Sequence, residues 1–344
     1  MENKSTIDNL YNDYERSKEK SSYRKNRYSK NCNLIYYKSS INPELTLAML
    51  IYKPKKPSYI LATTHGWHMN MPEFDKKAKP HDYLYIIVDM RGRKYSDGKQ
   101  DCNGYELMDV IDACEYVKKH YSKYLINKEV VYFEGGSGGG GNAYQIANKF
   151  PDYFSHITAL CGITDYALWY KDDKIGEFQD ELKPWIGYTP DENKEAYASR
   201  SAINSVSNLR THLFMAHGET DIRVPCYHAR NYFKKIKELN KTNLVEYFEV
   251  PKTGGPDHWS YISTENEQKL IDLSEKGRKQ NRKPVTLEKK GKLIIPGYLV
   301  TKYFDVFLND IGKMATISYD IKKRIYRIDS PVNYKLIEKI NNSN

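Results

Sequence analysis

Short apolar runs recur along the first 280 residues, and most are separated by segments whose apolar residues follow helical spacing. The predicted strands cover residues 33–37, 45–52, 59–64, 83–89, 130–133, 157–161, 211–216 and 245–250. The predicted helices cover residues 105–121, 143–150, 226–239 and 265–276. Strands that alternate with helices are typical of a mostly parallel sheet with helices on both faces. We therefore expect an α/β domain over residues 33–280.

Two stretches depart from this alternation. Residues 1–32 are polar and basic, with a helical pattern around residues 7–14, and we expect a lead-in without catalytic groups. Residues 162–205 lack a clear strand and are rich in acidic and aromatic side chains, including Trp169 and Trp185. We expect this second stretch to form a lid-like insertion over the active site.

The C-terminal part has a different pattern. Residues 276–284 are charged, lack apolar periodicity and predict a linker. Apolar runs then follow at residues 292–299, 303–308, 313–319 and 324–328, separated by turn-forming residues. We expect a small β-meander over residues 285–340. A few short strands are marginally stable alone, so this appendage should pack against the α/β domain.

Composition narrows the class of protein. The net charge of +10 over 344 residues is densest outside the expected catalytic core, which favours a solvated surface over a nucleic-acid partner. The five cysteines are scattered and form no C-x-x-C pair, as expected for free thiols in a reducing compartment without a zinc site. No apolar run has the length of about 18 residues that a membrane span needs. We expect a cytoplasmic protein without a membrane partner.

The strand at residues 130–133 leads directly into a glycine-rich turn. Gly135, Ser137 and Gly139 match G-x-S-x-G, the nucleophile elbow, in which a strained turn between strand and helix exposes a serine hydroxyl. A flexible glycine linker is the alternative, but an apolar strand precedes the turn and a helical pattern follows it. The context therefore favours Ser137 as a nucleophile.

A serine nucleophile needs a base, and the base needs an orienting carboxylate. Asp221 and His258 both follow predicted strands and come in the chain order of this architecture. Because active sites of open α/β sheets lie at the carboxyl ends of the strands, all three groups should meet at one edge. Glu219 is the alternative acid, and His228, at the start of a predicted helix, is the alternative base.

Acyl transfer also requires donors for the developing oxyanion. The residue after the nucleophile supplies one such N–H, which here is Gly138. The second donor comes from the loop after the third strand, where we expect the backbone N–H of Trp67. In the same loop, we expect His65 and Gly66 to shape the backbone.

Several motifs resemble the catalytic domain of the prolyl oligopeptidase family, which belongs to the α/β-hydrolase superfamily. Acetyl xylan esterases share much of the same pattern. The likeness spans residues 45–273 and includes the late His258. The matching segments are Thr64-His65-Gly66-Trp67, Asp89-x-Arg91-Gly92 with Ser96-x-Gly98, Gly135-Gly136-Ser137-Gly138-Gly139, Ser199-x-Ser201-x-Ile203-Asn204 and His217-Gly218-x-x-Asp221-x-x-Val224-Pro225.

The resemblance implies that Ser137, Asp221 and His258 form a catalytic triad. It also implies that Asp89 and Arg91 brace the loop near the elbow by charge-assisted hydrogen bonds. There are two departures from the family pattern. Fewer than fifty residues precede the first core strands, where the peptidases carry a large propeller, and Pro256-Asp257 stands before His258 where a glycine is usual. The first departure favours an esterase or a peptidase of small substrates.

The sequence thus predicts a serine hydrolase with an acyl-enzyme mechanism. The expected substrate is a small carboxylic ester, as for an acetyl esterase, and no metal or organic cofactor is expected. The first alternative is a serine peptidase that cleaves short peptides. The second is a non-catalytic protein that keeps the fold and binds an anionic partner through its basic surface.

Overall fold

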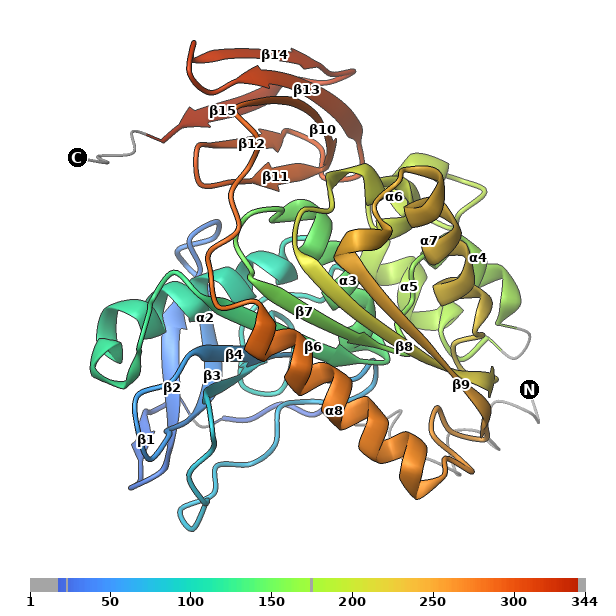
Figure 1. Ribbon diagram of the computed structural model, residues 1–344. Coiled ribbons are helices and arrows are strands. Elements are labelled where there is room, and N and C mark those ends of the chain that lie inside the picture. The colour runs from blue at the N-terminus through green and yellow to red at the C-terminus, as the bar shows by residue number, and fades with distance from the viewer. Residues whose placement is uncertain (1–17, 23, 174–175, 340–344) are drawn as a thin grey trace.

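A single large sheet organises the first 280 residues. The structure is a computed structural model that describes residues 18–22, 24–173 and 176–339, so the helix predicted around residues 7–14 lies outside the described residues. Nine strands follow the order β1-β2-β3-β5-β4-β6-β7-β8-β9 (Figure 1). Strands β4 to β9 run parallel, and the β1, β2 and β3 end is antiparallel. The strands are β1 (Arg27–Tyr28), β2 (Cys32–Lys38), β3 (Thr46–Tyr52), β4 (Ile60–Thr63), β5 (Leu84–Asp89), β6 (Val131–Gly136), β7 (His156–Leu160), β8 (His212–Asp221) and β9 (Val245–Gly255).

Helices cover both faces of this sheet. Successive residues of a strand point to opposite faces, and β8 shows the consequence. Leu213 and Met215 belong to the main core under helices α2 (Glu106–His120), α3 (Gly138–Lys149) and α7 (Tyr227–Glu238). Phe214 and Ala216 pack instead with helix α8 (Thr264–Gln280), which crosses the strands in front in Figure 1. The predicted α/β-hydrolase fold is confirmed.

Helix α8 is longer than predicted, which corrects the linker expected at residues 276–284. Residues 276–280 belong to the helix, because Gly277 and Arg278 are buried against the sheet. A Cβ on Gly277 would lie 2.2 Å from the imidazole of His156, so this close contact requires glycine. The lead-in predicted at residues 1–32 also contributes to the sheet, because β1 pairs with β2.

The insertion at residues 162–205 is helical. It contains α4 (Tyr166–Asp172), α5 (Gln179–Ile186) and α6 (Lys194–Ala198). Its apolar side chains form a second buried cluster that includes Trp67 from the loop after β4 and Val224 from the loop after β8. The insertion is therefore packed onto the loops at the carboxyl ends of the strands. Among the described helices, none is both long and apolar enough to cross a membrane.

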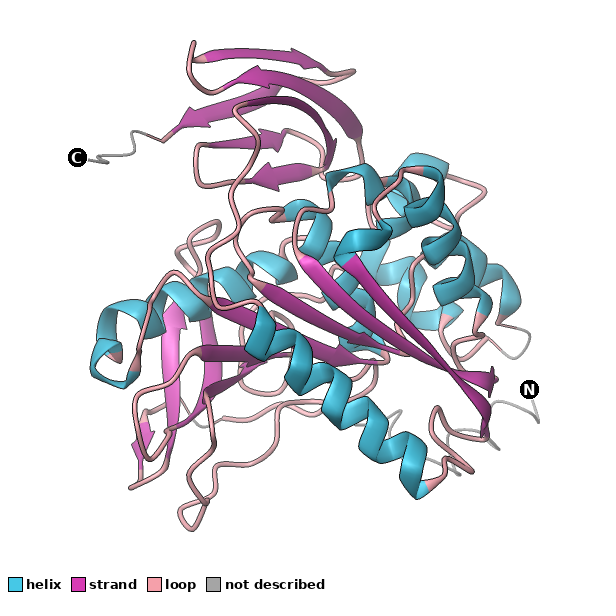
Figure 2. Ribbon diagram, viewed as in Figure 1, coloured by secondary structure: helices cyan, strands magenta, loops and turns pink. Residues whose placement is uncertain are grey.

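The C-terminal appendage is antiparallel, as predicted, and is built from two facing sheets of three strands. The sheet orders are β10-β13-β14 and β11-β12-β15, so β10 pairs with β13 and not with the next strand in sequence. Figure 2 shows these strands above the α/β domain. This arrangement buries the apolar side chains of both sheets in one core. The strands are β10 (Lys290–Pro296), β11 (Tyr298–Val300), β12 (Phe304–Leu308), β13 (Met314–Asp320), β14 (Ile325–Asp329) and β15 (Tyr334–Glu338).

Candidate active site

The turn between β6 and α3 has the geometry of a nucleophile elbow. Ser137 has φ 56° and ψ −120°, a conformation that non-glycine residues rarely adopt, and α3 begins at the next residue. The strand and helix pass so closely that a Cβ on Gly135 would lie 2.1 Å from the carbonyl oxygen of Gly139. A Cβ on Gly139 would lie 3.0 Å from Thr64 Oγ1. Contact therefore requires glycine at position 135, whereas a side chain at position 139 would need Thr64 to shift slightly.

Asp221 lies at the end of β8 and contacts His258. His258 Nδ1 donates a hydrogen bond to Asp221 Oδ2 at 2.6 Å. The other oxygen, Oδ1, accepts hydrogen bonds from the backbone N–H groups of Arg223 at 2.9 Å and Val224 at 3.0 Å. Burial disfavours the charge of this carboxylate, but the hydrogen bonds from His217 and His258 outweigh it and hold the pKa of Asp221 below its ordinary value.

Ser137 and His258 line the same pocket, which has a volume of about 240 Å³. The structure thus brings the three predicted residues together at the carboxyl ends of β6, β8 and β9. Within the described residues, no hydrogen bond joins the Ser137 hydroxyl to the imidazole. Such bonds are often long without substrate and shorten when it binds.

The two alternative residues lie elsewhere. Glu219 is exposed, and its carboxylate accepts the backbone N–H of Lys252 at 2.8 Å. His228 is buried in α7, and its Nδ1 lies 3.4 Å from the backbone nitrogen of Thr164. Neither side chain lines the pocket of Ser137.

The two predicted oxyanion donors are adjacent. Gly138 is the first residue of α3, where backbone N–H groups have no acceptor within the helix. A Cβ on Gly138 would lie only 2.7 Å from the backbone nitrogen of Trp67. The two N–H groups therefore come from backbone segments in direct contact, beside Ser137.

The remaining predicted residues support the loops. His65 is buried, and burial lowers its pKa to about 3, so the imidazole is neutral. Asp89 accepts the backbone N–H groups of Met71 at 3.3 Å and Tyr95 at 2.7 Å. None of these side chains, nor that of Arg91, lines the pocket, whereas the neighbouring Gly66 does.

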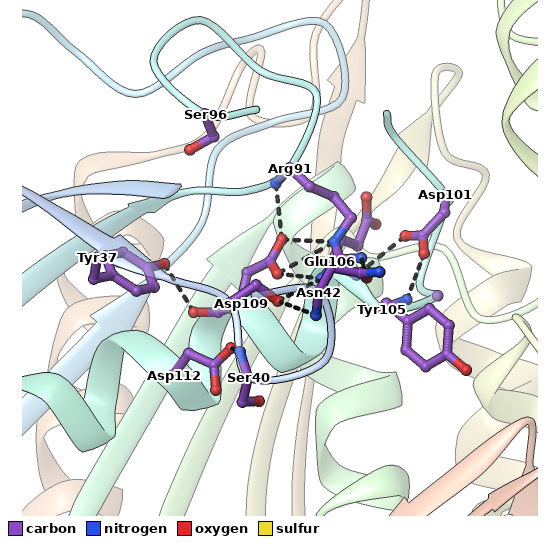
Figure 3. Close-up of polar contacts among 12 residues, drawn as sticks. Tyr37, Ser40, Asn42, Arg91, Ser96, Asp101, Tyr105, Glu106, Asp109 and Asp112 are labelled. Atoms are coloured by element: carbon purple, nitrogen blue, oxygen red, sulfur yellow. Dashed lines mark hydrogen bonds and ion pairs between the residues drawn. The ribbon is translucent and has the colours of Figure 1, made fainter. Parts of the chain in front are cut away.

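Arg91 binds a carboxylate on α2. Its Nη2 lies 2.6 Å from Asp109 Oδ1, and its Nε lies 3.0 Å from Oδ2 of the same residue (Figure 3). Burial disfavours the charge of Arg91, but the hydrogen bonds that the guanidinium donates to Asp109 outweigh this effect and raise its pKa. These contacts tie the loop after β5 to α2, and the bracing of the elbow that the resemblance implied stays a prediction.

Sequence patterns missed the polar cluster above the pocket. His68, which lines the pocket, lies between two buried carboxylates, with Nε2 3.1 Å from Glu177 Oε1 and Nδ1 3.1 Å from Glu181 Oε2. Arg223 Nη2 also binds Glu177 at 2.9 Å, and Trp67 Nε1 donates to Glu181 at 2.5 Å. These contacts tie the insertion to the loops after β4 and β8. The only sequence signal was the acidic, aromatic composition of residues 162–205.

Among the described residues, one group of side chains could hold a metal ion. Cys161 Sγ, an oxygen of Asp221 and a ring nitrogen of His258 lie within 4.8 Å of one another. Burial, followed by the charge of Asp221, raises the pKa of the thiol well above its ordinary value. Asp221 and His258 of this group are the predicted acid and base of the triad. The expectation that the protein binds no metal stays a prediction.

Comparisons with solved structures show the fold. An acylaminoacyl peptidase of Pyrococcus horikoshii matches 75% of this chain at 22% identity, with a TM-score of 0.55. A putative dipeptidyl aminopeptidase IV from Bacteroides ovatus matches 76% at 17% identity, with a TM-score of 0.57. The aligned parts cover only 40% and 36% of those chains. An esterase of Pyrococcus furiosus aligns over 98% of its own length and 77% of this chain, at 12% identity and a TM-score of 0.52.

A search of curated protein sequences finds no match. The sequence profile of the prolyl oligopeptidase family, however, matches residues 73–272, more than half of the chain. The matched part contains Ser137, Asp221 and His258. The chain therefore belongs to the prolyl oligopeptidase family of serine hydrolases.

Proposed function

We propose that this protein hydrolyses small carboxylic esters, with Ser137 as nucleophile, His258 as general base and Asp221 as the acid that orients it. The observation that carries this proposal is the 2.6 Å hydrogen bond between Asp221 and His258, whose imidazole shares one pocket with Ser137. Because the Asp221 carboxylate can only accept, it fixes the proton on Nδ1. Nε2 is then the nitrogen that can accept a proton.

The proposed reaction has two steps. Ser137 Oγ attacks the ester carbonyl while its proton passes to His258 Nε2, and the alkoxide of the collapsing intermediate leaves with that proton. Water then attacks the acyl-enzyme, with His258 again as base, and releases the carboxylic acid. The N–H groups of Gly138 and Trp67 stabilise the negative charge on the carbonyl oxygen in both steps.

The dimensions of the pocket favour a small ester. Its volume of about 240 Å³ lies below the usual range for sites that enclose drug-sized ligands. Trp169 and Phe178 of the insertion form one wall, with their rings stacked 4.0 Å apart. The small volume beside these rings favours a short acyl group over a long one.

A serine peptidase of short peptides is the second candidate. The family and the similarity to an acylaminoacyl peptidase support it. The two candidates differ in the leaving group, which is an alcohol for the esterase and an amine for the peptidase. The ratio of kcat/KM for p-nitrophenyl acetate to that for N-acetylalanine p-nitroanilide separates them. A ratio below one would contradict the esterase proposal.

Ser137→Ala tests the mechanism. Turnover of p-nitrophenyl acetate should fall about 10⁴-fold or more, because the acyl acceptor is lost. Ser122→Ala, at an exposed serine of a short 3₁₀ helix, is the matched control and should retain full turnover. A fluorophosphonate probe should label the native chain and the control but not Ser137→Ala. Undiminished turnover in Ser137→Ala would rule out this nucleophile, and absence of labelling in the native chain would favour a non-catalytic protein.

A further inference from the structure

A second cavity lies on the other side of the elbow, between α8 and the sheet. It has a volume of about 410 Å³ and shares no lining residue with the pocket of Ser137. Figure 2 shows α8 crossing the strands in front of this face. The apolar part of its wall consists of Leu160, Trp259, Ile262, Leu270 and Ile271. We call this cavity the α8 groove.

Gly136 opens the α8 groove. It is the residue between the first motif glycine and Ser137, and it is exposed. A Cβ at this position would meet no atom closer than 3.9 Å, in contrast to the 2.1 Å found at Gly135. The φ of Gly136 is not in the left-handed region. Neither the backbone nor a neighbour requires glycine here, and the missing side chain leaves space at the wall of the groove.

Arg278 lines the α8 groove and has one donor without a hydrogen-bond partner among the described residues. Its side chain lines the groove and is 6% exposed. Its Nη1 binds Glu134 at 2.8 Å, and its Nη2 binds Glu275 at 2.7 Å. The Nε–H is buried and has no hydrogen-bond partner within the described part of the chain. A buried donor without an acceptor costs free energy, so a ligand that supplies an acceptor here is favoured.

The charges around this donor select the kind of acceptor. One guanidinium faces the carboxylates of Glu134 and Glu275, and Glu267 also lines the groove. The local charge is therefore negative, and a ligand carboxylate would be repelled. A neutral carbonyl oxygen can accept the Nε–H without that repulsion, while an apolar body packs against the aliphatic and indole side chains.

We propose that the α8 groove binds an uncharged acyl compound, an ester or amide with an apolar body. The groove shares no lining residue with the catalytic pocket, so only the blocking step of the test rests on the proposed nucleophile. Trp259 directly follows His258 and forms part of the wall. An occupant therefore contacts the loop that carries the proposed base.

Prodan, a neutral naphthalene with one propionyl carbonyl, is a suitable probe. The full chain is first treated with diisopropyl fluorophosphate, which fills the catalytic pocket at Ser137. Prodan should still bind saturably, with a blue shift of its emission. Gly136→Leu should weaken binding at least 10-fold, because the new side chain fills the groove. Ser122→Leu, at an exposed site elsewhere, is the matched control and should bind as the native chain does.

Ser274→Phe blocks the α8 groove from the opposite wall, and so tests the site without altering the elbow. Circular dichroism and thermal unfolding show which variants fold. Dodecanamide should displace Prodan at a concentration at least 10-fold lower than dodecanoate. The proposal is overturned if the treated native chain shows no saturable binding, or if folded Gly136→Leu and Ser274→Phe bind as tightly as the native chain. A preference for dodecanoate would overturn the inference of an uncharged ligand.

Discussion

Arg91 and Asp109 form a buried ion pair that holds the loop after β5 against α2. Asp109 is fully buried, and Arg91 is 5% exposed. Three hydrogen bonds from the guanidinium and one from the backbone N–H of Arg91 satisfy the carboxylate. Removing one partner of such a pair leaves an uncompensated buried charge, which costs far more than losing a surface pair. At the residue scale, stability should therefore depend strongly on this one carboxylate.

Asp109→Asn tests this dependence. The substitution keeps the shape of the side chain but leaves the Arg91 charge without a counter-ion, and should lower the free energy of unfolding by about 3–5 kcal/mol. The measurement is urea unfolding followed by circular dichroism. Asp112→Asn, three residues along α2, is the control, because the Asp112 carboxylate accepts the backbone N–H of Ser40 and takes no part in the ion pair. Asp112→Asn should lower the free energy of unfolding by about 1 kcal/mol. Equal losses in the two variants would contradict a special role for the pair.

At the element scale, the crossing of β6 and α3 sets the position of Ser137. Gly135 and Gly139 touch across this crossing, whereas Gly136 faces open space. Three neighbouring glycines thus have different tolerance for a methyl group, although the sequence shows them as one run. The backbone contact at Gly135 cannot be relieved by rotating a side chain, so any added atom has to move the strand or the helix.

Gly135→Ala should therefore destabilise the fold by about 3 kcal/mol or more, since it places a methyl group inside backbone contact distance. It should also lower turnover of p-nitrophenyl acetate in the fraction that folds, because Ser137 moves with the helix. Gly136→Ala is the matched control and should change the melting temperature by about 2 °C or less. A Gly135→Ala protein as stable as Gly136→Ala would show that the elbow is looser than these contacts require.

At the scale of the whole molecule, the appendage and the α/β domain share a core. Tyr298 of β11 lies in the main hydrophobic cluster, and its ring stacks on that of Tyr105 at 5.5 Å. Lys149, the last residue of α3, is buried beneath it with Nζ 4.1 Å from the Tyr298 ring centre. Burial, with the nearby charge of Arg200, lowers the pKa of Lys149 well below its ordinary value. This junction therefore links the stability of the molecule to pH.

The sign of this dependence follows from proton binding. Below the ordinary lysine pKa of about 10.4, the unfolded chain holds a proton on Lys149 that the folded chain binds weakly. Stability should therefore rise with pH in this range, by up to about 1.4 kcal/mol per pH unit for this group. Lys149→Met should remove that slope and stabilise the protein near pH 7. Urea unfolding between pH 7 and pH 10 measures how the free energy of unfolding changes with pH. Lys128→Met, at an exposed lysine, is the control and should keep the slope of the native chain. An unchanged slope in Lys149→Met would contradict a neutral buried lysine.

Local patterns were sufficient for much of the fold and for the candidate residues of the site. The apolar run before Ser137 and the glycines around it specify a strand, a turn and a helix through short-range sterics alone. Asp221 and His258 could be predicted from the sequence because each follows a strand of a parallel sheet, which places both at one edge. Contacts between distant segments could not be predicted in this way. The end of α8 was not predicted, because residues 276–280 lack apolar periodicity. Gly277 and Arg278 belong to the helix because they are buried against the sheet.

The sequence by itself determined the α/β-hydrolase fold, the elbow and the membership of the family, since these depend on periodicity, turn chemistry and motif order. Tertiary structure alone decided that Asp221 and not Glu219 binds His258, that Arg91 pairs with Asp109, and that Trp169 and Phe178 of the insertion line the pocket. It also decided that Gly136 borders open space, whereas Gly135 lies in close backbone contact with Gly139. The physical reason is that hydrogen bonds, burial and close packing depend on which distant atoms meet, and sequence spacing does not specify that.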